Sequence, residues 1–292
     1  MQVVTTIAEV RAVTEGARAS GGSVGFVPTM GYLHEGHVSL MAAARRADDL
    51  VLASVFVNPL QFGAGEDLAA YPRDLDRDLA LAEAAGVDVV FAPPVEEMYP
   101  RPLLTSVAVA EITDRFEGAS RPTHFAGVAT VVAKLFAIVG PCRAYFGEKD
   151  WQQVCVVRRM AADLSLPVDV VACPTDREPD GLARSSRNVY LSVEERAAAP
   201  VLHRALRQGA ARVEAGERDP AAVEAAMAAT VAAEPLVALD YVAAVEAETL
   251  ASPERLAGAI RLLVAARVGR PRLLDNLGLT VAPKTTPPPG AG

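Results

Sequence analysis

Cysteine and histidine are scarce in this chain of 292 residues, which has three of the first and four of the second. The cysteines, Cys142, Cys155 and Cys173, are odd in number and far apart, so they do not suit a disulfide framework. Neither CxxC nor HExxH occurs, and this absence argues against a zinc site. We expect the three cysteines to be small apolar core residues with free thiols, as in a protein of a reducing compartment.

Long hydrophobic runs and an excess of basic charge are also missing. No run reaches the roughly 18 apolar residues that a membrane span needs, and the first residues, MQVVTTIAEVRAV, do not resemble a signal peptide. The formal net charge is -8, whereas affinity for phosphate backbones depends on clustered Lys and Arg. We therefore expect a cytoplasmic protein that binds neither membrane nor nucleic acid.

Apolar strand-like runs alternate with amphipathic helical patterns in the first part of the chain. The strand candidates are residues 24–27, 50–57, 87–91, 144–146 and 168–172; the helical patterns are 38–46, 75–85, 126–139 and 151–164. Near-continuous apolar strands separated by helices are typical of a parallel sheet covered on both faces. The pattern predicts an α/β fold with a doubly wound parallel sheet.

A change in composition near residues 174–192 suggests a second domain. The segment PTDREPDGLARSSRNVYLS is polar and rich in turn residues; an Ala-rich helical region at 193–233 and strand-like runs at 239–245 and 260–268 follow. We predict a first domain of residues 1–177 and a smaller α+β domain of residues 178–281, with SSRN as a lid or hinge. The Pro-rich residues 282–292 are expected to be disordered.

The most informative motif is PTMGYLHEGH, residues 28–37, between the first strand and a helical pattern. A helix N-terminus attracts anions, and Gly31 and Gly36 allow a ligand to approach the backbone closely. His34 and His37 are three residues apart, so both can donate hydrogen bonds to one phosphate chain. Alone, such a pair also fits a Gly-rich turn or a metal site.

Polar side chains follow two further strands of the predicted sheet. Asn58 and Gln61 follow the second strand, and Lys149 and Asp150 follow the strand that ends at Phe146. Ligands of parallel sheets bind beyond the carboxyl ends of the strands, so these side chains and the two histidines are expected at one edge. Lys149 and Asp150 also fit a solvated pair with Asp150 capping a helix, and residues 185–187 fit a polar turn.

Six motifs in order carry a close resemblance to the pantothenate synthetase family over residues 1–281. Besides HxGH they are FVNPLQF (56–62), YPR (71–73), RPTHFAGV (121–128), FGEKDWQQ (146–153) and SSRN (185–188), with RLLVAARVGRPRLLDN (261–276) further along. The resemblance implies a Rossmann-like fold of the HxGH nucleotidylyltransferase type. It also implies a homodimer, and Mg²⁺ bound with ATP as substrate, without a metal site of the protein's own.

The implied reaction joins pantoate to β-alanine in two steps. The pantoate carboxylate attacks the α-phosphorus of ATP and expels pyrophosphate; the β-alanine amine then attacks the pantoyl adenylate and releases AMP. A carboxylate that attacks a phosphate needs fixed cations and hydrogen-bond donors around it. By resemblance these catalytic groups are His34, His37, Lys149, Ser185, Ser186 and Arg187.

The resemblance also distributes binding roles. ATP falls to the loop Met30, Gly31, Tyr32, Leu33, His34, Glu35, Gly36 and His37, to Gly147, Glu148, Lys149 and Asp150, and to Asp176, Arg184, Ser185, Ser186 and Arg187. Pantoate falls to Gln61, Gln153, Met30, Arg121 and His124, and β-alanine to Gln61, Asn58 and Tyr71, the last near a Gly- and Asp-rich loop at 63–67. Neutral carboxamides hold a reacting acid without trapping it in an ion pair.

Two positions depart from the family pattern. The family usually has methionine where this chain has Arg184, and a small apolar residue near the adenine where it has Asp176. The extra guanidinium fits either a contact to the triphosphate or an orientation into solvent. Asp176 is compatible with the reaction if backbone groups read the adenine and its side chain faces water.

Three other functions share parts of this pattern. A class I aminoacyl-tRNA synthetase fragment also uses HxGH, although the acidic balance and the absence of a tRNA-binding region argue against it. Another HxGH nucleotidylyltransferase would release pyrophosphate but no AMP. A catalytically inactive nucleotide-binding regulator would need binding groups but no transition-state donors.

Overall fold

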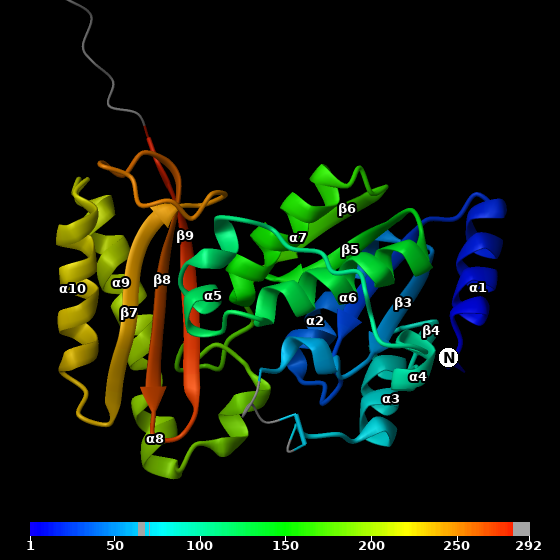
Figure 1. Ribbon diagram of the computed structural model, residues 1–292. Helices are drawn as coiled ribbons and strands as arrows, with labels where there is room; N and C mark the ends of the chain where they lie inside the picture. The colour runs from blue at the N-terminus through cyan, green and yellow to red at the C-terminus, as the bar shows by residue number, and fades with distance from the viewer. Residues whose placement is uncertain (64–67, 70, 283–292) are drawn as a thin grey trace, which may run out of the picture. The chain divides into compact units, whose positions relative to one another are not determined.

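The computed structural model describes residues 1–63, 68–69 and 71–282 and contains two compact units (Figure 1). The first comprises Met1–Arg177 with Arg184–Ser186, and the second Glu178–Ala183 with the chain from Arg187 onward. The chain therefore passes between the units at three points within ten residues. The domain limits 1–177 and 178–281 stay a prediction. Of the tail that we expect to be disordered, only Ala282 belongs to the described residues.

The first unit is built on a six-stranded sheet in which every pair of neighbours is parallel, as the sequence predicts. Its spatial order is β1-β4-β3-β2-β5-β6, with β1 Gln2–Val4, β2 Val24–Thr29, β3 Leu50–Val55, β4 Val89–Phe91, β5 Cys142–Gly147 and β6 Val168–Cys173. The short edge strand β1 was not predicted. Three residues are too few to show a period.

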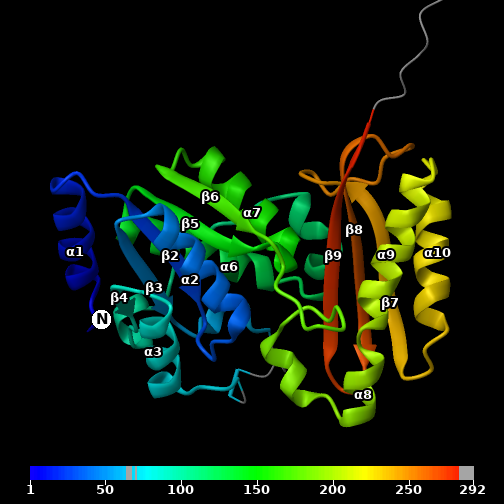
Figure 2. The ribbon, with the colours of Figure 1, turned by 180° about the vertical axis from the view of Figure 1, so that it is seen from behind.

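Helices cover both faces of this sheet (Figures 1 and 2). On one face lie α1 (Ile7–Ala19), α6 (His124–Val139) and α7 (Trp151–Asp163), and on the other α2 (Glu35–Ala47) and α3 (Leu75–Ala84). The strands between these layers are almost wholly apolar, with Phe26 and Val27 of β2 inaccessible to solvent. Helix α1 was not predicted, although the capping box of Thr6 and Glu9 marks its start.

Short helices complete the first unit. They are α4 (Val95–Met98), α5 (Glu117–Ser120), η1 (Pro59–Gln61), η2 (Ile112–Asp114) and η3 (Glu148–Asp150), while η4 (Ser186–Tyr190) spans a passage between the units. Trp151 opens α7 and is 8% exposed, so it packs into the core of the first unit. Within the described residues, no helix is long and apolar enough to span a membrane.

The strand order fixes where a ligand is expected. From β2 the chain builds outward to β3 and β4, then returns past β2 to add β5 and β6 on its other side. The order therefore reverses between β2 and β5, which are paired through Gly25 and Phe26. In doubly wound sheets the ligand crevice opens at such a reversal, beyond the carboxyl ends of the strands. HxGH follows β2 and Lys149 follows β5.

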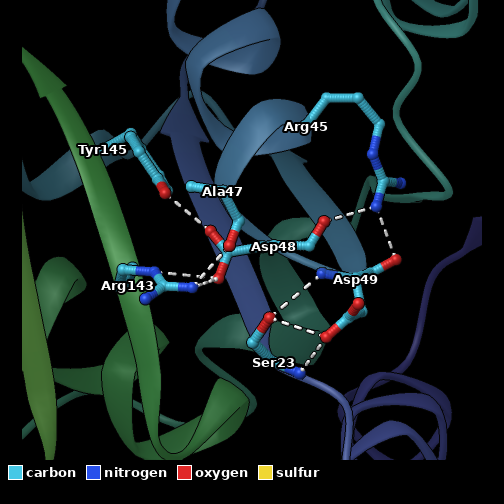
Figure 3. A network of polar contacts seen from close by, with 7 residues as sticks. All are labelled: Ser23, Arg45, Ala47, Asp48, Asp49, Arg143 and Tyr145. Carbon is cyan, nitrogen blue, oxygen red and sulfur yellow. Dashed lines mark hydrogen bonds and ion pairs between the residues drawn. The ribbon is translucent and has the colours of Figure 1, made fainter.

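A polar network ties the far end of α2 to β5 (Figure 3). Asp48, the C-cap of α2, is 6% exposed; it accepts from Arg143 Nε and Nη2 at 3.0 and 2.7 Å, and from the Tyr145 hydroxyl at 2.6 Å. Burial, then the bond to Asp48, raises the pKa of Tyr145. Fixed in this way against β5, α2 presents its N-terminal turn at the opposite end of the sheet.

The second unit is an antiparallel sheet in the order β7-β8-β9, Val237–Glu246, Gly258–Val268 and Arg272–Val281. The helical region predicted at 193–233 is three helices, α8 (Val193–Ala198), α9 (Val201–Glu214) and α10 (Pro220–Ala232). Pro200 separates the first two, because proline cannot continue a helical hydrogen-bond ladder. Strand β9 was not predicted; it contains Asp275, Asn276 and Gly278, which are disfavoured in strands.

Candidate active site

The loop between β2 and α2 has an unusual backbone. Gly31 has φ +82° and Tyr32 has φ +49°, so two successive residues adopt the left-handed conformation. The Gly31 amide donates to Thr29 Oγ1 at 3.1 Å, while the amides of Tyr32 and Leu33 donate to the Asp78 carboxylate at 2.7 and 2.6 Å. The backbone amides of this turn therefore donate their hydrogen bonds to side chains of the protein itself.

The two histidines are held by hydrogen bonds at the start of α2. His34 is the N-cap, and its Nδ1 accepts from the Gly36 amide at 3.1 Å; His37 Nδ1 accepts from the His34 amide at 3.3 Å. The ring centroids lie 4.1 Å apart. Because both Nδ1 atoms accept, each neutral ring carries its proton on Nε2. A Cβ at position 36 would lie 2.9 Å from His34 Cε1, so a larger residue than Gly36 would displace this ring.

Both imidazoles are neutral at physiological pH. Burial, followed by the charge of Lys149, lowers the pKa of His34 to about 4. Burial, followed by the charge of His34, lowers the pKa of His37 to about 3. The site therefore offers two neutral Nε2–H donors, which can bind a phosphate oxygen without changing protonation state.

This geometry refines the expectation for the loop. The sequence suggested anion binding by unpaired amides, but the amides of residues 31–34 and of Gly36 all donate within the protein. In this loop, donation to a phosphate chain therefore falls mainly to the imidazoles. The amides instead set the positions of the rings.

Lys149 and Asp150 follow β5 and precede α7, as predicted. Lys149 Nζ lies 3.4 Å from Asp150 Oδ1, with side chains 17% and 51% exposed. Asp150 occupies the N-cap position of α7, as that alternative expected, although within the described structure its side chain makes no capping hydrogen bond. The charges of Lys149 and Asp150 both act on the pKa values of His34 and His37, which places these four groups in one electrostatic neighbourhood.

Gln61 follows β3 and contacts Met30, which follows β2. Its Nε2 lies 2.7 Å from the Met30 sulfur, and Asn58 Nδ2 donates to Gln61 Oε1 at 3.3 Å and to the Gly127 carbonyl at 3.1 Å. The orientation of Asn58 is fixed in turn, because its Oδ1 accepts from the Tyr99 hydroxyl at 2.8 Å. Gln61 therefore presents its amide nitrogen toward Met30.

Arg121 and His124 meet at the backbone of Gln61. Arg121 Nη2 donates to the Gln61 carbonyl at 3.3 Å, and His124 Nδ1 lies 3.0 Å from the same oxygen. In this arrangement they support the residue predicted to bind pantoate. Their predicted contact with pantoate itself stays a prediction.

Arg184 and Asp176, the two departures from the family pattern, pair with each other. Arg184 Nε lies 3.0 Å from Asp176 Oδ2, and the Arg184 amide donates to the Asp176 carbonyl at 3.0 Å. A second carboxylate, Glu35 Oε2, lies 3.4 Å from Arg184 Nη1. Arg184 is therefore tied to the start of α2 instead of extending into solvent, and its charge contributes to the lowered pKa of His34.

The remaining predicted residues lie in three places. Gln153 is on the first turn of α7, and Gly147 and Glu148 precede this helix in the chain. Tyr71 lies with its ring centroid 6.0 Å from that of Phe62, while residues 64–67 of the adjoining loop lie outside the described part of the chain. Ser185 and Ser186 belong to the first unit and Arg187 to the second. Their predicted roles stay predictions.

Three residues that shape the site were not predicted from sequence. They are Asp78 under the loop, Tyr99 behind Asn58, and Gln152, which donates to the carbonyls of Ile112 and Arg115 at 2.7 and 2.8 Å and accepts from the Glu117 amide at 3.1 Å. For Asp78 a signal existed: it lies one turn before buried Ala82 on α3, so a carboxylate occupies the apolar face of a helix.

Comparison with known proteins gives the family. The family model described as pantoate-beta-alanine ligase matches residues 2–278. Pantothenate synthetase of Moorella thermoacetica is 54% identical over 281 residues, 96% of this chain and 99% of that protein. The same enzyme of a Roseiflexus species is 57% identical over 277 residues, 94% of this chain and 98% of that protein.

Solved structures agree in fold and sequence. The crystal structure of pantothenate synthetase from Thermus thermophilus has a TM-score of 0.90 and 53% identity, and the match covers 97% of this chain and 100% of that one. Pantoate-beta-alanine ligase from Francisella tularensis, complexed with beta-gamma ATP and β-alanine, has a TM-score of 0.77 and 33% identity, with 95% and 97% covered. This chain belongs to the pantoate–β-alanine ligase family.

Proposed function

We propose that this protein condenses pantoate with β-alanine, using ATP and forming a pantoyl adenylate, and that the groups around His34 and His37 carry the first step. The observation behind this assignment is the pair of neutral Nε2–H donors after β2, in the same electrostatic neighbourhood as Lys149 after β5. These strands flank the reversal of the sheet, where nucleotide crevices occur.

In the adenylation step, negative charge builds up around the α-phosphorus while pyrophosphate departs. His34 and His37 donate to the phosphate oxygens, and Lys149 supplies a fixed positive charge, with Ser185, Ser186 and Arg187 as further donors. Donors held in place before the reaction need no reorganisation during it, which is the main source of such stabilisation. The loop from Met30 to His37, with Gly147, Glu148, Asp150, Asp176 and Arg184, surrounds the nucleotide.

Pantoate is oriented by the two glutamines. Gln61 presents its amide nitrogen on the Met30 side because Asn58 occupies its carbonyl oxygen. Gln153, Arg121 and His124 complete the pantoate side, and Gln61, Asn58 and Tyr71 the β-alanine side. Orientation alone is able to supply several kcal/mol, up to roughly 7 to 11, toward such a reaction.

Mg²⁺ is proposed to enter with the triphosphate and to neutralise part of its charge. Among the described residues, no group of three or more His, Cys, Asp and Glu is placed to hold a metal ion. We expect this ion to be held mainly by phosphate oxygens and water.

The reaction is tested by its products and its partial reaction. Purified protein with ATP, Mg²⁺, pantoate and β-alanine should yield AMP and pyrophosphate in equal amounts, without RNA. When β-alanine is omitted, pantoate should promote exchange of labelled pyrophosphate into ATP. Release of pyrophosphate without AMP would instead identify a dinucleotide-forming nucleotidylyltransferase.

Variants separate catalysis from binding. His37→Ala and Lys149→Ala should lower the exchange rate far more than ATP affinity, because these donors act most strongly in the transition state. Arg11→Ala, at an exposed cation on α1, is the control and should match the wild type. Equal losses of rate and affinity would favour a nucleotide-binding regulator.

A homodimer and a cytoplasmic location are also proposed. Residues 128–139 of α6 are largely apolar, but most of them are buried within a single chain, so they give no evidence for a dimer interface. The dimer therefore rests on the family resemblance. Light scattering should give twice the 30.6 kDa of the chain; a mass of one chain at micromolar concentration would contradict it.

A further inference from the structure

Asp78 is a buried carboxylate that faces the loop before the histidines. It lies on α3, is 2% exposed, and accepts the Tyr32 amide on Oδ2 at 2.7 Å and the Leu33 amide on Oδ1 at 2.6 Å. Both oxygens are thus used on two successive amides. A carboxylate is an acceptor on both oxygens, whereas an asparagine in the same place could accept only one of the two bonds.

The turn that Asp78 holds is one that the chain adopts only with support. Tyr32, a residue with a large side chain, has φ +49°, directly after Gly31 at φ +82°. A Cβ on Gly31 would lie 2.9 Å from both Asp78 Oδ2 and Val55 Cγ1, so only glycine lets the loop approach so closely. The guanidinium of neighbouring Arg77 lies 5.1 Å from the centroid of the Tyr32 ring and supports the same turn.

This turn leads directly into the hydrogen bonds of the two imidazoles. Leu33 is adjacent to His34, whose amide donates to His37 Nδ1 and whose own Nδ1 accepts from Gly36. A change in the peptide planes at residues 32 and 33 therefore turns the His34 amide away from His37. The hydrogen bond from the His34 amide to Nδ1 is what keeps the proton of His37 on Nε2, so its loss frees the tautomer of His37.

We propose that Asp78 is a positioning residue for adenylation: by binding the amides of Tyr32 and Leu33 it sets the place and the tautomer of His34 and His37. The inference rests on the proposed function, in which these imidazoles act on ATP. Asp78 itself lies behind the loop and touches no reacting atom. Its effect on the reacting atoms is carried by the two rings.

The test compares Asp78→Asn with Asp76→Asn, a change of the same size at an exposed position on the same helix. In Asp78→Asn we expect the pantoate-dependent pyrophosphate exchange to fall roughly 10- to 100-fold, since misplacement of about 1 Å has effects of this size. Asp76→Asn should match the wild type. kcat/KM for β-alanine in the complete reaction should stay within about twofold, because that substrate reacts in the second step, after adenylation.

A second readout does not depend on activity. The ¹⁵N shifts of the imidazole nitrogens should show the Nε2–H tautomer for both rings in the wild type and in Asp76→Asn. In Asp78→Asn, His37 should show a mixture of tautomers. In the wild type, the Tyr32 and Leu33 amides should exchange with solvent slowly; fast exchange would overturn the proposal even if Asp78→Asn does not fold.

The outcomes separate this inference from the proposed function. If His37→Ala loses exchange activity while Asp78→Asn keeps both its rate and the wild-type tautomers, the role of Asp78 is refuted and the function stands. If Asp78→Asn only melts at a lower temperature, with rate and tautomers unchanged, Asp78 is structural and the proposal fails. If the wild type shows no pantoate-dependent exchange, the proposed function itself fails.

Discussion

At the scale of single residues, the chemistry of the site depends on histidines that stay neutral. Imidazole in an unfolded chain has a pKa near 6.5, whereas burial lowers the pKa of His34 to about 4 and that of His37 to about 3. Between about pH 6.5 and the lowered pKa of each histidine, the unfolded state therefore binds more protons than the folded state. Protonation in this window favours unfolding.

The stability of the protein should accordingly fall as the pH drops from about 6.5 toward 4. Each ring contributes a slope of at most about 1.4 kcal/mol per pH unit. Urea unfolding at pH 7, 6 and 5 measures the slope, and a double variant, His34→Asn with His37→Asn, should have a shallower one. Identical slopes in the two proteins would contradict this account.

The Arg184–Asp176 pair is expected to act as one unit. Arg184→Met removes the cation that lies 3.0 Å from Asp176, and Asp176→Val removes the carboxylate that lies nearer to Arg184 than Glu35 does. Each single change should raise KM for ATP, and the double variant should recover part of the loss. Since both side chains are partly exposed, we expect a coupling energy of about 0.5 to 1 kcal/mol.

A double-mutant cycle on KM for ATP measures this coupling. Asp180→Ala with Arg196→Ala is a comparison pair of similar exposure in the second unit, joined at 2.6 Å. That pair should leave KM for ATP unchanged. Additive effects of Arg184→Met and Asp176→Val would show that the two residues act independently.

At the scale of the elements, two adjacent glutamines on α7 have different tasks. Gln152 is 6% exposed and binds three backbone groups of residues 112–117, where Phe116 has the unfavourable φ of +50°. Gln153 is partly exposed and is the predicted pantoate ligand. The pair therefore allows stability and substrate binding to be altered separately.

Gln152→Ala should lower the free energy of unfolding by about 1 to 3 kcal/mol, because it removes a buried side chain that makes three hydrogen bonds to the backbone. Gln153→Ala should change stability by less than about 0.5 kcal/mol but raise KM for pantoate strongly. Urea denaturation and pantoate titration of the two variants measure these effects. If both variants lose stability equally, the division of tasks is wrong.

Periodicity explains which elements were predictable from sequence. The strands of the parallel sheet are continuous apolar runs, and α3 and α7 end within one residue of their predicted limits. Strands β1 and β9 were missed because one is too short for a pattern and the other contains residues disfavoured in strands. The loops after β2, β3 and β5 were found because unusual polar residues follow apolar strands.

The partners of those loops could not be predicted in the same way. Asp78 lies 45 residues beyond Leu33, and Tyr99 lies 41 beyond Asn58, so neither contact has a local pattern. The hydrogen-bond acceptors of the loop amides could not be predicted either, since one of them is a carboxylate on another helix. Sequence indicated which side chains matter; the contacts of their backbone required the fold.

At the scale of the whole molecule, the chain passes between its two compact units at residues 177–178, 183–184 and 186–187. The segment predicted to bind phosphate, Ser185 to Arg187, coincides with the last passage. Backbone that binds a ligand only in the folded state is stabilised by the ligand, by about 2.7 kcal/mol at a concentration of 100 times Kd. ATP and pantoate should therefore stabilise this segment.

Hydrogen exchange, followed by mass spectrometry, provides the measurement. With ATP, Mg²⁺ and pantoate present and β-alanine omitted, exchange at residues 184–190 and at the loop 30–37 should slow by at least tenfold. The amides of β8 lie in the interior of an antiparallel sheet and serve as the internal control, since their exchange should change little. Protection of the loop without protection of residues 184–190 would remove Ser185, Ser186 and Arg187 from the phosphate site, while His34, His37 and Lys149 would keep their proposed roles.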